Sequence, residues 1–397
     1  MINYSLRNLW HRKTRNSLTI LSILVGIATI FIFISFGMGL YDYVQDAVLD
    51  SSADKLIVQA RGVGAPGLDT TFKLEDKDLK EIRKTPGVLE ASGSYFKVAK
   101  IESRKEFVYA YLIAYNPENS LIMEIFGIDI SEGRELRKGD SKGVVLGSNY
   151  KIPNKIFSKP IGLNQKIEVQ GVSLKVVGFY EPVGNPQDDS NIYISENYLD
   201  KLYPDENNSY GWIVARVNPL NIDSVIERLE KNLRKVRDLK EGKEDFFVQS
   251  FQEMMSSYMD SLNIIIGFII LIALVSVFVS AVNTANTMIT SVLERIKEIG
   301  VIKSIGARNS EIFSIFLFES SLLGLIAGVL GVFMGWGIAN FGGIFLENLG
   351  WGFLAPSFPP VLFAGCVLFA IITGAISGVF PAMKASRINV IDALRYE

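Results

Sequence analysis

Four long runs of apolar residues without a charged side chain divide this chain of 397 residues. They extend over residues 16–41, 261–293, 320–346 and 348–383. Each run is longer than the roughly 20 residues that a helix needs to cross a bilayer. The pattern therefore predicts four transmembrane helices, which we place at 17–41, 261–293, 312–346 and 359–383.

Two of these helices are expected to continue beyond the membrane. The run 261–293 would extend about 50 Å as a helix, which exceeds the ~30 Å hydrocarbon core of a bilayer. Asp42, Asp46 and Asp50 follow the first run at helical spacing. We therefore expect a stalk on the outer side of both the first and the second span.

Residues 42–260 show the shorter periodicities of a water-soluble domain. Alternating β-branched and aromatic residues predict strands at 55–60, 88–101, 107–115, 143–146, 166–169, 173–180, 191–194 and 212–217. Apolar residues at helical spacing predict helices at 74–84, 117–126, 148–157, 196–203 and 222–236. Two prolines and a glycine at 181–190 predict an exposed loop. We expect two lobes, with about 116–205 inserted into a unit made by 50–115 and 206–250.

The predicted fold class is therefore an α-helical membrane protein with four transmembrane helices. A large mixed α/β extracytoplasmic domain, residues 42–260, is inserted between helices 1 and 2. An N-terminal amphipathic segment (1–16), a loop at 294–311, a loop at 347–358 and a tail at 384–397 complete the chain.

The distribution of positive charge predicts the orientation. Lysine and arginine occur in 1–16, in 294–311 and in 384–397, whereas the loop 347–358 contains neither. Because positively charged loops stay inside, we expect both termini and 294–311 to be cytoplasmic, with 42–260 and 347–358 outside. The first run is too long for a cleaved signal peptide. These features predict a multi-pass protein of the cell membrane, embedded in the lipid bilayer.

Composition and motifs limit the kinds of bond and site that we expect on this chain. The hydrophobic content is 49%, with one cysteine, Cys366, and one histidine, His11. The outer domain is therefore expected to fold without disulfides, and a zinc or haem site of the usual kind is not expected. The sequence contains no P-loop, no H-E-x-x-H and no G-x-S-x-G motif. We expect no catalytic residue, no cofactor or metal on this chain and no nucleic-acid partner.

A short charged stretch, residues 294–308, separates the second and third runs. As a helix it places Ile296, Ile299 and the stem of Lys303 on one side and Glu294, Arg295 and Glu298 on another. Gly306 is suited to the left-handed end of such a helix. The pattern favours a helical contact for a partner, although a solvated connector has similar features.

Glycines and one acid mark the last two spans. Gly324, Gly328, Gly331 and Gly335 lie at spacings of four, three and four residues in the third span, and Gly374 and Gly378 lie in the fourth. Such small residues let membrane helices approach closely. Glu319 is an intramembrane acid, for which we favour a hydrogen bond to a neighbouring helix or a short reach to the interface.

These motifs resemble the FtsX-like, MacB-type permease subunits of ABC transporters over nearly the whole chain. The segments that carry the resemblance are Leu6–Leu9 with Arg15 and Leu18–Thr19, Glu294–Arg295, Glu298–Gly300, Lys303–Ala307, Glu319, Gly378, Pro381–Ala382, Ala385 and Asp392–Arg395. Asn389–Val390 departs from the family, in which a proline is usual there.

The resemblance implies a dimeric permease, homo- or heteromeric, that engages two copies of a separate cytoplasmic ABC ATPase, which binds the ATP and Mg²⁺. Movement of a coupling helix would be transmitted to the outer domain, for export or extraction of a peptide, lipoprotein, lipid or drug-like substrate. The matching coupling residues are Glu294, Arg295, Glu298, Ile299, Gly300, Ile302, Lys303, Gly306, Ala307 and Arg308. Within this set we expect Arg295, Glu298, Lys303 and Arg308 to anchor the ATPase, and Ile299 and Ile302 to pack into its groove.

Other functions remain open at this point. An FtsX-like regulator of cell-envelope enzymes would also use an ATPase, whereas a membrane receptor or scaffold would leave the 294–308 helix without a role. An intramembrane enzyme would need paired catalytic residues in the spans. An external adaptor or substrate-binding protein is a further partner that the sequence neither requires nor excludes.

Overall fold

The computed structural model describes residues 13–49, 53–62, 72–140, 142–204 and 209–395. It divides into two compact units. The helical unit comprises Met1–Leu40, Ser261–Leu346 and Leu354–Glu397, and the outer domain comprises Tyr41–Asp260 and Glu347–Phe353. The predicted N-terminal amphipathic segment lies outside the described residues, except for its last positions.

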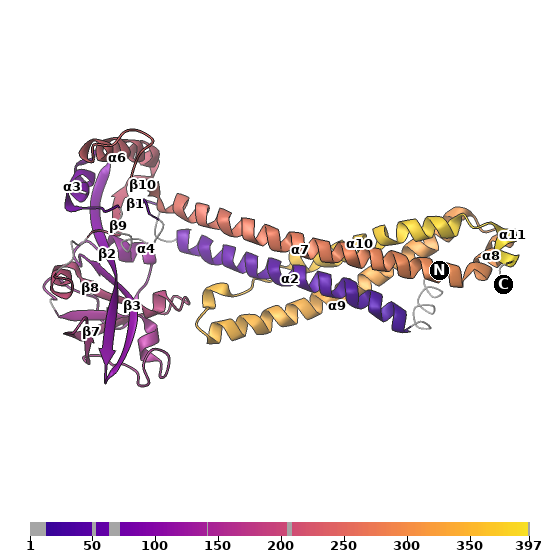
Figure 1. Ribbon diagram of the computed structural model, residues 1–397, viewed down its shortest axis with the longest axis horizontal. Helices are drawn as coiled ribbons and strands as arrows, with labels where there is room; N and C mark the ends of the chain where they lie inside the picture. The colour runs from indigo at the N-terminus through magenta and orange to yellow at the C-terminus, as the bar shows by residue number, and fades with distance from the viewer. Residues whose placement is uncertain (1–12, 50–52, 63–71, 141, 205–208, 396–397) are drawn as a thin grey trace. The chain divides into compact units, whose positions relative to one another are not determined.

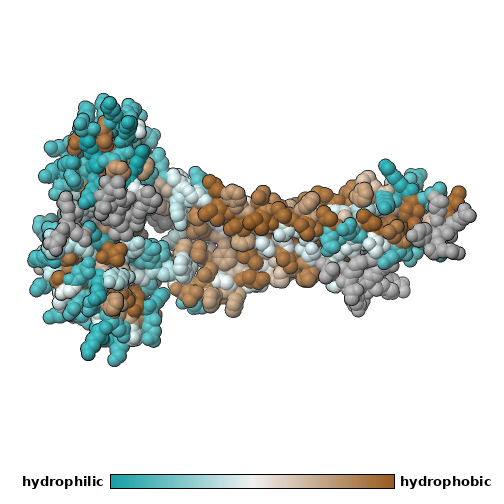
Figure 2. Space-filling model, viewed as in Figure 1, coloured by the Kyte–Doolittle hydropathy of each residue, from teal (hydrophilic) through white to brown (hydrophobic). Residues whose placement is uncertain are grey.

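Within the described residues, four helices are long and apolar enough to cross a membrane. They are α2 (Lys13–Leu49), α7 (Phe251–Glu294), α9 (Asn309–Asn348) and α10 (Pro360–Ser386) (Figure 1). The 44 residues of α7 correspond to a length of roughly 66 Å. Helix α2 continues through the positions of Asp42 and Asp46, so both helices extend past the predicted spans. Apolar side chains cover the visible face of these helices (Figure 2).

Helix α9 contacts both α10 and α2 through its glycines. A Cβ atom at Gly324 would lie 2.5 Å from the carbonyl oxygen of Ala370 in α10, and one at Gly331 would lie 2.9 Å from the carbonyl oxygen of Leu24 in α2. The six glycines singled out in the sequence all lie at such contacts: Gly324, Gly328, Gly374 and Gly378 between α9 and α10, and Gly331 and Gly335 against α2. Their lack of a side chain lets the backbones approach.

Helices α2 and α7 are joined by hydroxyl groups. Ser22 and Ser280 are hydrogen-bonded through their Oγ atoms at 2.9 Å, and the Ser280 hydroxyl also lies 2.9 Å from the Ser22 carbonyl oxygen. Thr19 donates to Thr287 at 3.2 Å nearer the start of α2. Because lipid gives apolar helices no hydrophobic reason to associate, close packing and such hydrogen bonds hold the pair together.

The outer domain is built on one ten-stranded sheet in the order β10-β1-β9-β2-β3-β8-β5-β7-β4, with β6 pairing β2 and β7. The strands are β1 (Lys55–Ala60), β2 (Val88–Ser103), β3 (Glu106–Tyr115), β4 (Ile130–Gly133), β5 (Gly143–Leu146), β6 (Lys166–Val169), β7 (Val172–Tyr180), β8 (Ile192–Ser195), β9 (Trp212–Val217) and β10 (Phe246–Ser250). The helices are α3 (Asp76–Lys84), α4 (Leu121–Phe126), α5 (Leu199–Leu202) and α6 (Ile222–Val236), with 3₁₀ turns η1 (Ser148–Lys151), η2 (Asp188–Ser190), η3 (Glu196–Tyr198) and η4 (Pro219–Asn221).

One half of this sheet carries helices. Strands β10, β1, β9 and the first part of β2 pair antiparallel. Helices α3 and α6 contact each other and cover this half (Figure 1). The apolar face of α6 supplies Val225, Leu229 and Leu233 to a core that also contains Leu56 and Ile213. This is the face that helical spacing predicts.

The other half of the sheet closes on itself. Strand β2 pairs β3, then β8, β5, β7 and β6 follow in turn, and β6 pairs back onto β2. The result is a six-stranded barrel with its own apolar core, which includes Ile101, Leu112, Val144, Val176 and Ile194. The barrel begins earlier in the chain than the expected boundary at 116, since β2 and β3 supply two of its strands.

One predicted helix of the outer domain is absent, and two of its strands were not predicted. The helix expected at 148–157 is only the 3₁₀ turn η1, because Pro153 cannot continue a helix and Asn154 has a φ of 61°. Strand β10 was not predicted, although its buried Phe246, Val248 and Ser250 alternate with more exposed residues. The short strand β4 was not predicted.

The glycine contacts yield a test of helix packing. A Cβ at Gly374 would lie 2.6 Å from the Ser320 carbonyl oxygen, and backbone atoms cannot move aside, so Gly374→Ala should lower stability by about 1–3 kcal/mol. Gly365 lies on the same helix with nothing within 4 Å of its Cβ position, so Gly365→Ala is the matched control. Thermal unfolding in lipid nanodiscs measures both. Equal melting temperatures for the two variants would contradict the close α9–α10 contact.

Candidate functional site

The predicted 294–308 helix is present as α8 (Ile296–Ser304). Helix α7 ends at Glu294. The backbone of Arg295, with φ −108° and ψ 16°, is not helical and separates α7 from α8. Gly306 has a φ of 106°, and the Ala307 N–H donates to the Ile302 carbonyl oxygen at 3.3 Å. This is the left-handed helix end predicted for Gly306.

Helix α9 follows α8 almost at once. The Arg308 N–H donates to the side chain of Glu311 at 2.8 Å, and the Ile312 N–H donates to the Arg308 carbonyl oxygen at 3.3 Å. The first bond satisfies a donor that the start of a helix leaves free, and the second is a backbone bond of the first turn of α9. The connection between α8 and α9 is therefore a short, defined turn.

A buried ion pair joins the α7–α8 junction to α9. The Arg295 Nη1 atom lies 3.1 Å from the Glu319 Oε2 atom, and their side chains are 7% and 6% exposed. Burying a charge is costly unless an opposite charge and hydrogen bonds compensate it. Glu319 of α9 is therefore bonded to the turn between α7 and α8, and its partner Arg295 is the first cation that follows the second span.

Lys303 fixes the other end of α8. Its Nζ atom donates to the carbonyl oxygens of Ser386 at 3.0 Å and Ile388 at 2.7 Å. These carbonyls lie at the C-terminal end of α10, where a positive charge interacts favourably with the helix dipole. The next helix, α11 (Val390–Arg395), contacts α8.

The apolar side of α8 faces the protein's own core. Ile299 is 3% exposed and belongs to a cluster with Met288, Ile312, Phe316 and Ala382, against which Ile302 and Ala307 are partly buried. Gly300 is also buried. Three expectations are thereby corrected. Ile299 is not available to enter a partner's groove, and Arg295 is engaged with Glu319 and so is not an exposed anchor. The ammonium group of Lys303 bonds to the end of α10 and not to a partner.

A second set of apolar residues is exposed instead. Val301 is 51% and Ile305 is 81% exposed, and Ile391 of α11 is exposed as well. The charged residues Glu294, Lys297, Glu298 and Arg308 are also exposed. Helical spacing identifies an apolar stripe but not whether the stripe faces the chain itself or a partner, so these positions were not predicted.

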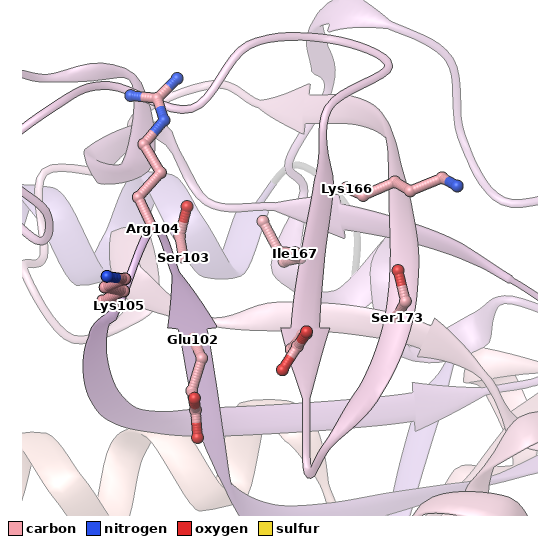
Figure 3. Close-up of a pocket in the computed structure, with 8 residues that line it drawn as sticks. Glu102, Ser103, Arg104, Lys105, Lys166, Ile167 and Ser173 are labelled. Carbon is pink, nitrogen blue, oxygen red and sulfur yellow. The ribbon is translucent and has the colours of Figure 1, made fainter.

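The outer domain contains a pocket of about 300 Å³ at one end of the barrel. In Figure 3, Glu102 and the turn residues Arg104 and Lys105 lie on one side of the pocket. Lys166 and Ser173 lie on the other side. Glu168 also lines the pocket. Its charges are of both signs and partly offset one another, so this pocket gives no clear chemical preference, and the α8 region remains the candidate site.

Comparison with known proteins decides the family. Residues 17–232 match the MacB-like periplasmic core domain, and residues 250–390 match the FtsX-like permease C-terminal domain. This chain belongs to the MacB/FtsX family of ABC transporter permeases. The resemblance and the fold class inferred from the sequence are thus confirmed. The protein is a permease subunit, and its domain between α2 and α7 is extracytoplasmic.

Two permease relatives match this chain over nearly their whole length, and a third relative matches over part of its length. The chain is 30% identical to an ABC transporter permease of Methanocaldococcus jannaschii, with coverage of 100% of this chain and 98% of the relative. It is 26% identical to the ABC transporter permease YvrN of Bacillus subtilis, covering 100% and 99%. It is 25% identical to the macrolide export ATP-binding/permease protein MacB of Acinetobacter baylyi, covering 97% of this chain but 58% of that protein.

The buried ion pair yields a second test. Arg295→Met leaves Glu319 buried without its partner, and Glu319→Met does the same to Arg295, so each should cost about 3–5 kcal/mol of stability. The double variant removes both charges and should be more stable than either single variant. Thermal unfolding of all four proteins in nanodiscs measures the coupling. If the losses simply add, the two side chains do not stabilise each other.

Proposed function

We propose that this permease couples ATP hydrolysis on a separate cytoplasmic ATPase to movement of its extracytoplasmic domain. The observation that carries the proposal is the fixation of α8 at both ends, by Arg295–Glu319 and by Lys303 with the end of α10. A helix held in this way cannot shift without moving α7, α9 and α10. It is suited to receive force from a partner.

The exposed residues of this segment are the proposed contact with the ATPase. Val301 and Ile305 supply apolar area, and the charges of Glu298 and Arg308 surround it. Partly exposed apolar anchors within a polar rim are typical of protein interfaces. In this proposal Arg295, Ile299 and Lys303 position the helix, whereas Val301 and Ile305 touch the partner.

The subunit composition, the orientation and the location of the ATP site are proposed from the family, from the distribution of lysine and arginine, and from the motifs of the sequence. Two ATPase copies, which bind ATP and Mg²⁺, would serve a dimer of this permease or a heterodimer with a related chain. The excess of lysine and arginine near both termini and at α8 supports a cytoplasmic location for these segments. The absence of a P-loop from the sequence supports an ATP site on another chain.

The proposed substrate is a peptide, lipoprotein, lipid or drug-like molecule that is exported or extracted from the membrane. Support comes from a relative named for macrolide export. Support for mechanical transmission comes from the spans, which carry one buried acid, and that acid is paired. An external adaptor would extend the same system.

The exposed residues of α8 provide the test. Val301→Asp and Ile305→Asp should each reduce co-purification with the ABC ATPase encoded nearest this permease, and should reduce permease stimulation of its ATP hydrolysis about tenfold or more, because they place a charge in a desolvated contact. The matched control is Leu220→Asp, which changes an exposed apolar residue of the outer domain.

Unaltered binding and hydrolysis in both α8 variants would exclude this surface. If no ABC ATPase associates with the wild-type permease, the proposed coupling is wrong and a receptor or scaffold function becomes the better explanation.

A further inference from the structure

A buried carboxylate organises the loop that precedes β8. Asp189 is 3% exposed, and its Oδ1 and Oδ2 atoms accept hydrogen bonds from the backbone N–H groups of Val183 at 2.7 Å and Gly184 at 3.2 Å. Its own N–H donates to the Asn185 carbonyl oxygen at 2.9 Å. A carboxylate that accepts two backbone N–H bonds fixes the peptide units that donate them. The loop 183–189 is therefore held in one shape.

The same loop is fastened to the barrel. The Asn149 side-chain amide donates to the Pro186 carbonyl oxygen and to Ser190 Oγ, at 3.2 and 2.9 Å. The Tyr150 hydroxyl donates to the Ser190 carbonyl oxygen at 3.0 Å. Next to β5, a Cβ at Gly147 would overlap the backbone carbonyl of Asp189. The composition of 181–190 predicts only an exposed loop, so this degree of order needs a reason.

The ordered loop contacts the connection between α9 and α10. The Phe353 N–H donates to the Gly184 carbonyl oxygen at 3.2 Å. A Cβ at Gly184 would lie 3.3 Å from the Gly352 Cα atom, so the two backbones touch. The Phe353 ring lies 5.9 Å from the Tyr43 ring and 5.6 Å from the Trp351 ring, measured between centroids.

A further contact lies one turn earlier. The Gly350 N–H closes a turn on the Glu347 carbonyl oxygen at 2.8 Å, with φ +87° at Gly350. A Cβ there would lie 2.7 Å from Lys155 Nζ and 3.8 Å from Pro186 Cγ. All of these residues group with the outer domain, although α9 ends at Asn348 and α10 begins at Pro360. A segment that merely joined two helices would need none of these partners.

We propose that Glu347–Phe353 is a structural part of the outer domain and gives that domain a third connection to the membrane helices, beside α2 and α7. Asp189 is the positioning residue, because it aims the Gly184 carbonyl at the Phe353 N–H. We call the contact between the loop 183–189 and the segment Glu347–Phe353 the joint. The existence of the joint does not depend on the proposed function. Its consequence does: movement of the outer domain would load α9 and α10 as well as α2 and α7.

The test is amide hydrogen exchange, read by mass spectrometry, on the full-length permease in nanodiscs without ATPase. Wild-type peptides covering 347–354 should be protected. Asp189→Ala removes the acceptor of two backbone bonds and should speed exchange of these peptides about tenfold, because the Gly184 carbonyl is then no longer held in place. Exchange in β1 should not change, which separates a local effect from unfolding.

The matched control is the neighbouring acid. Asp188 lies 2.8 Å from the Asn185 side-chain amide but accepts no bond from the N–H groups of Val183 or Gly184. Asp188→Ala should therefore leave the protection of 347–354 within about twofold of wild type. Fast exchange of 347–354 in the wild type would overturn the proposal, and so would equal protection in Asp189→Ala and wild type.

A second variant covers the case in which Asp189→Ala does not fold. Phe353→Pro removes the N–H that donates to Gly184 and should speed exchange of peptides covering 183–190, whereas Phe353→Leu keeps the donor and should change them less. Equal exchange of 183–190 in these two variants would contradict the joint. Because no ATPase is present in either experiment, a failure of the ATPase assays and a failure of the joint give different results.

Discussion

The contact between Arg295 and Glu319 is the constraint on which the α8 region of this permease depends. Two charges with little exposure lie beside long apolar helices, where each alone would be costly. Together they hold the junction between α7 and α8 against α9. Lys303 does the same at the other end of α8 by capping α10. These contacts hold α8 to three of the four long helices.

Close contacts between the long helices continue along the bundle. The glycines of α9 let its backbone touch both α10 and α2, and the serine pair Ser22–Ser280 joins α2 to α7. Such contacts are short and directional, unlike those between large apolar side chains that lipid can replace. Helices joined in this way move together more readily than they slide past one another. These contacts join the four long helices into one bundle.

The sequence predicts features that arise from a repeating pattern of apolar and polar residues. It does not predict features that depend on contact with residues far away in the chain. Apolar runs identified the four long helices, and alternation identified β1, β5, β6 and β9 with their correct bounds. Gly306 was recognised because its left-handed conformation is a local property. Ile299 and Arg295 were assigned to a partner protein because periodicity shows that a face is apolar or charged, not what covers it. Much of their cover comes from α9 and α10, which lie later in the chain.

The connection between α9 and α10 shows the same limit at a larger scale. Its sequence, rich in glycine and aromatic residues, indicates only a short external loop, and the prolines and acids of 181–190 indicate another. Neither predicts that Asp189 orders one loop so that its backbone bonds to the other. A domain attached through two helices can still rotate about them, whereas a third attachment restrains that rotation. The barrel, which has no free edge among its six paired strands, supplies the rigid body that makes such a restraint effective.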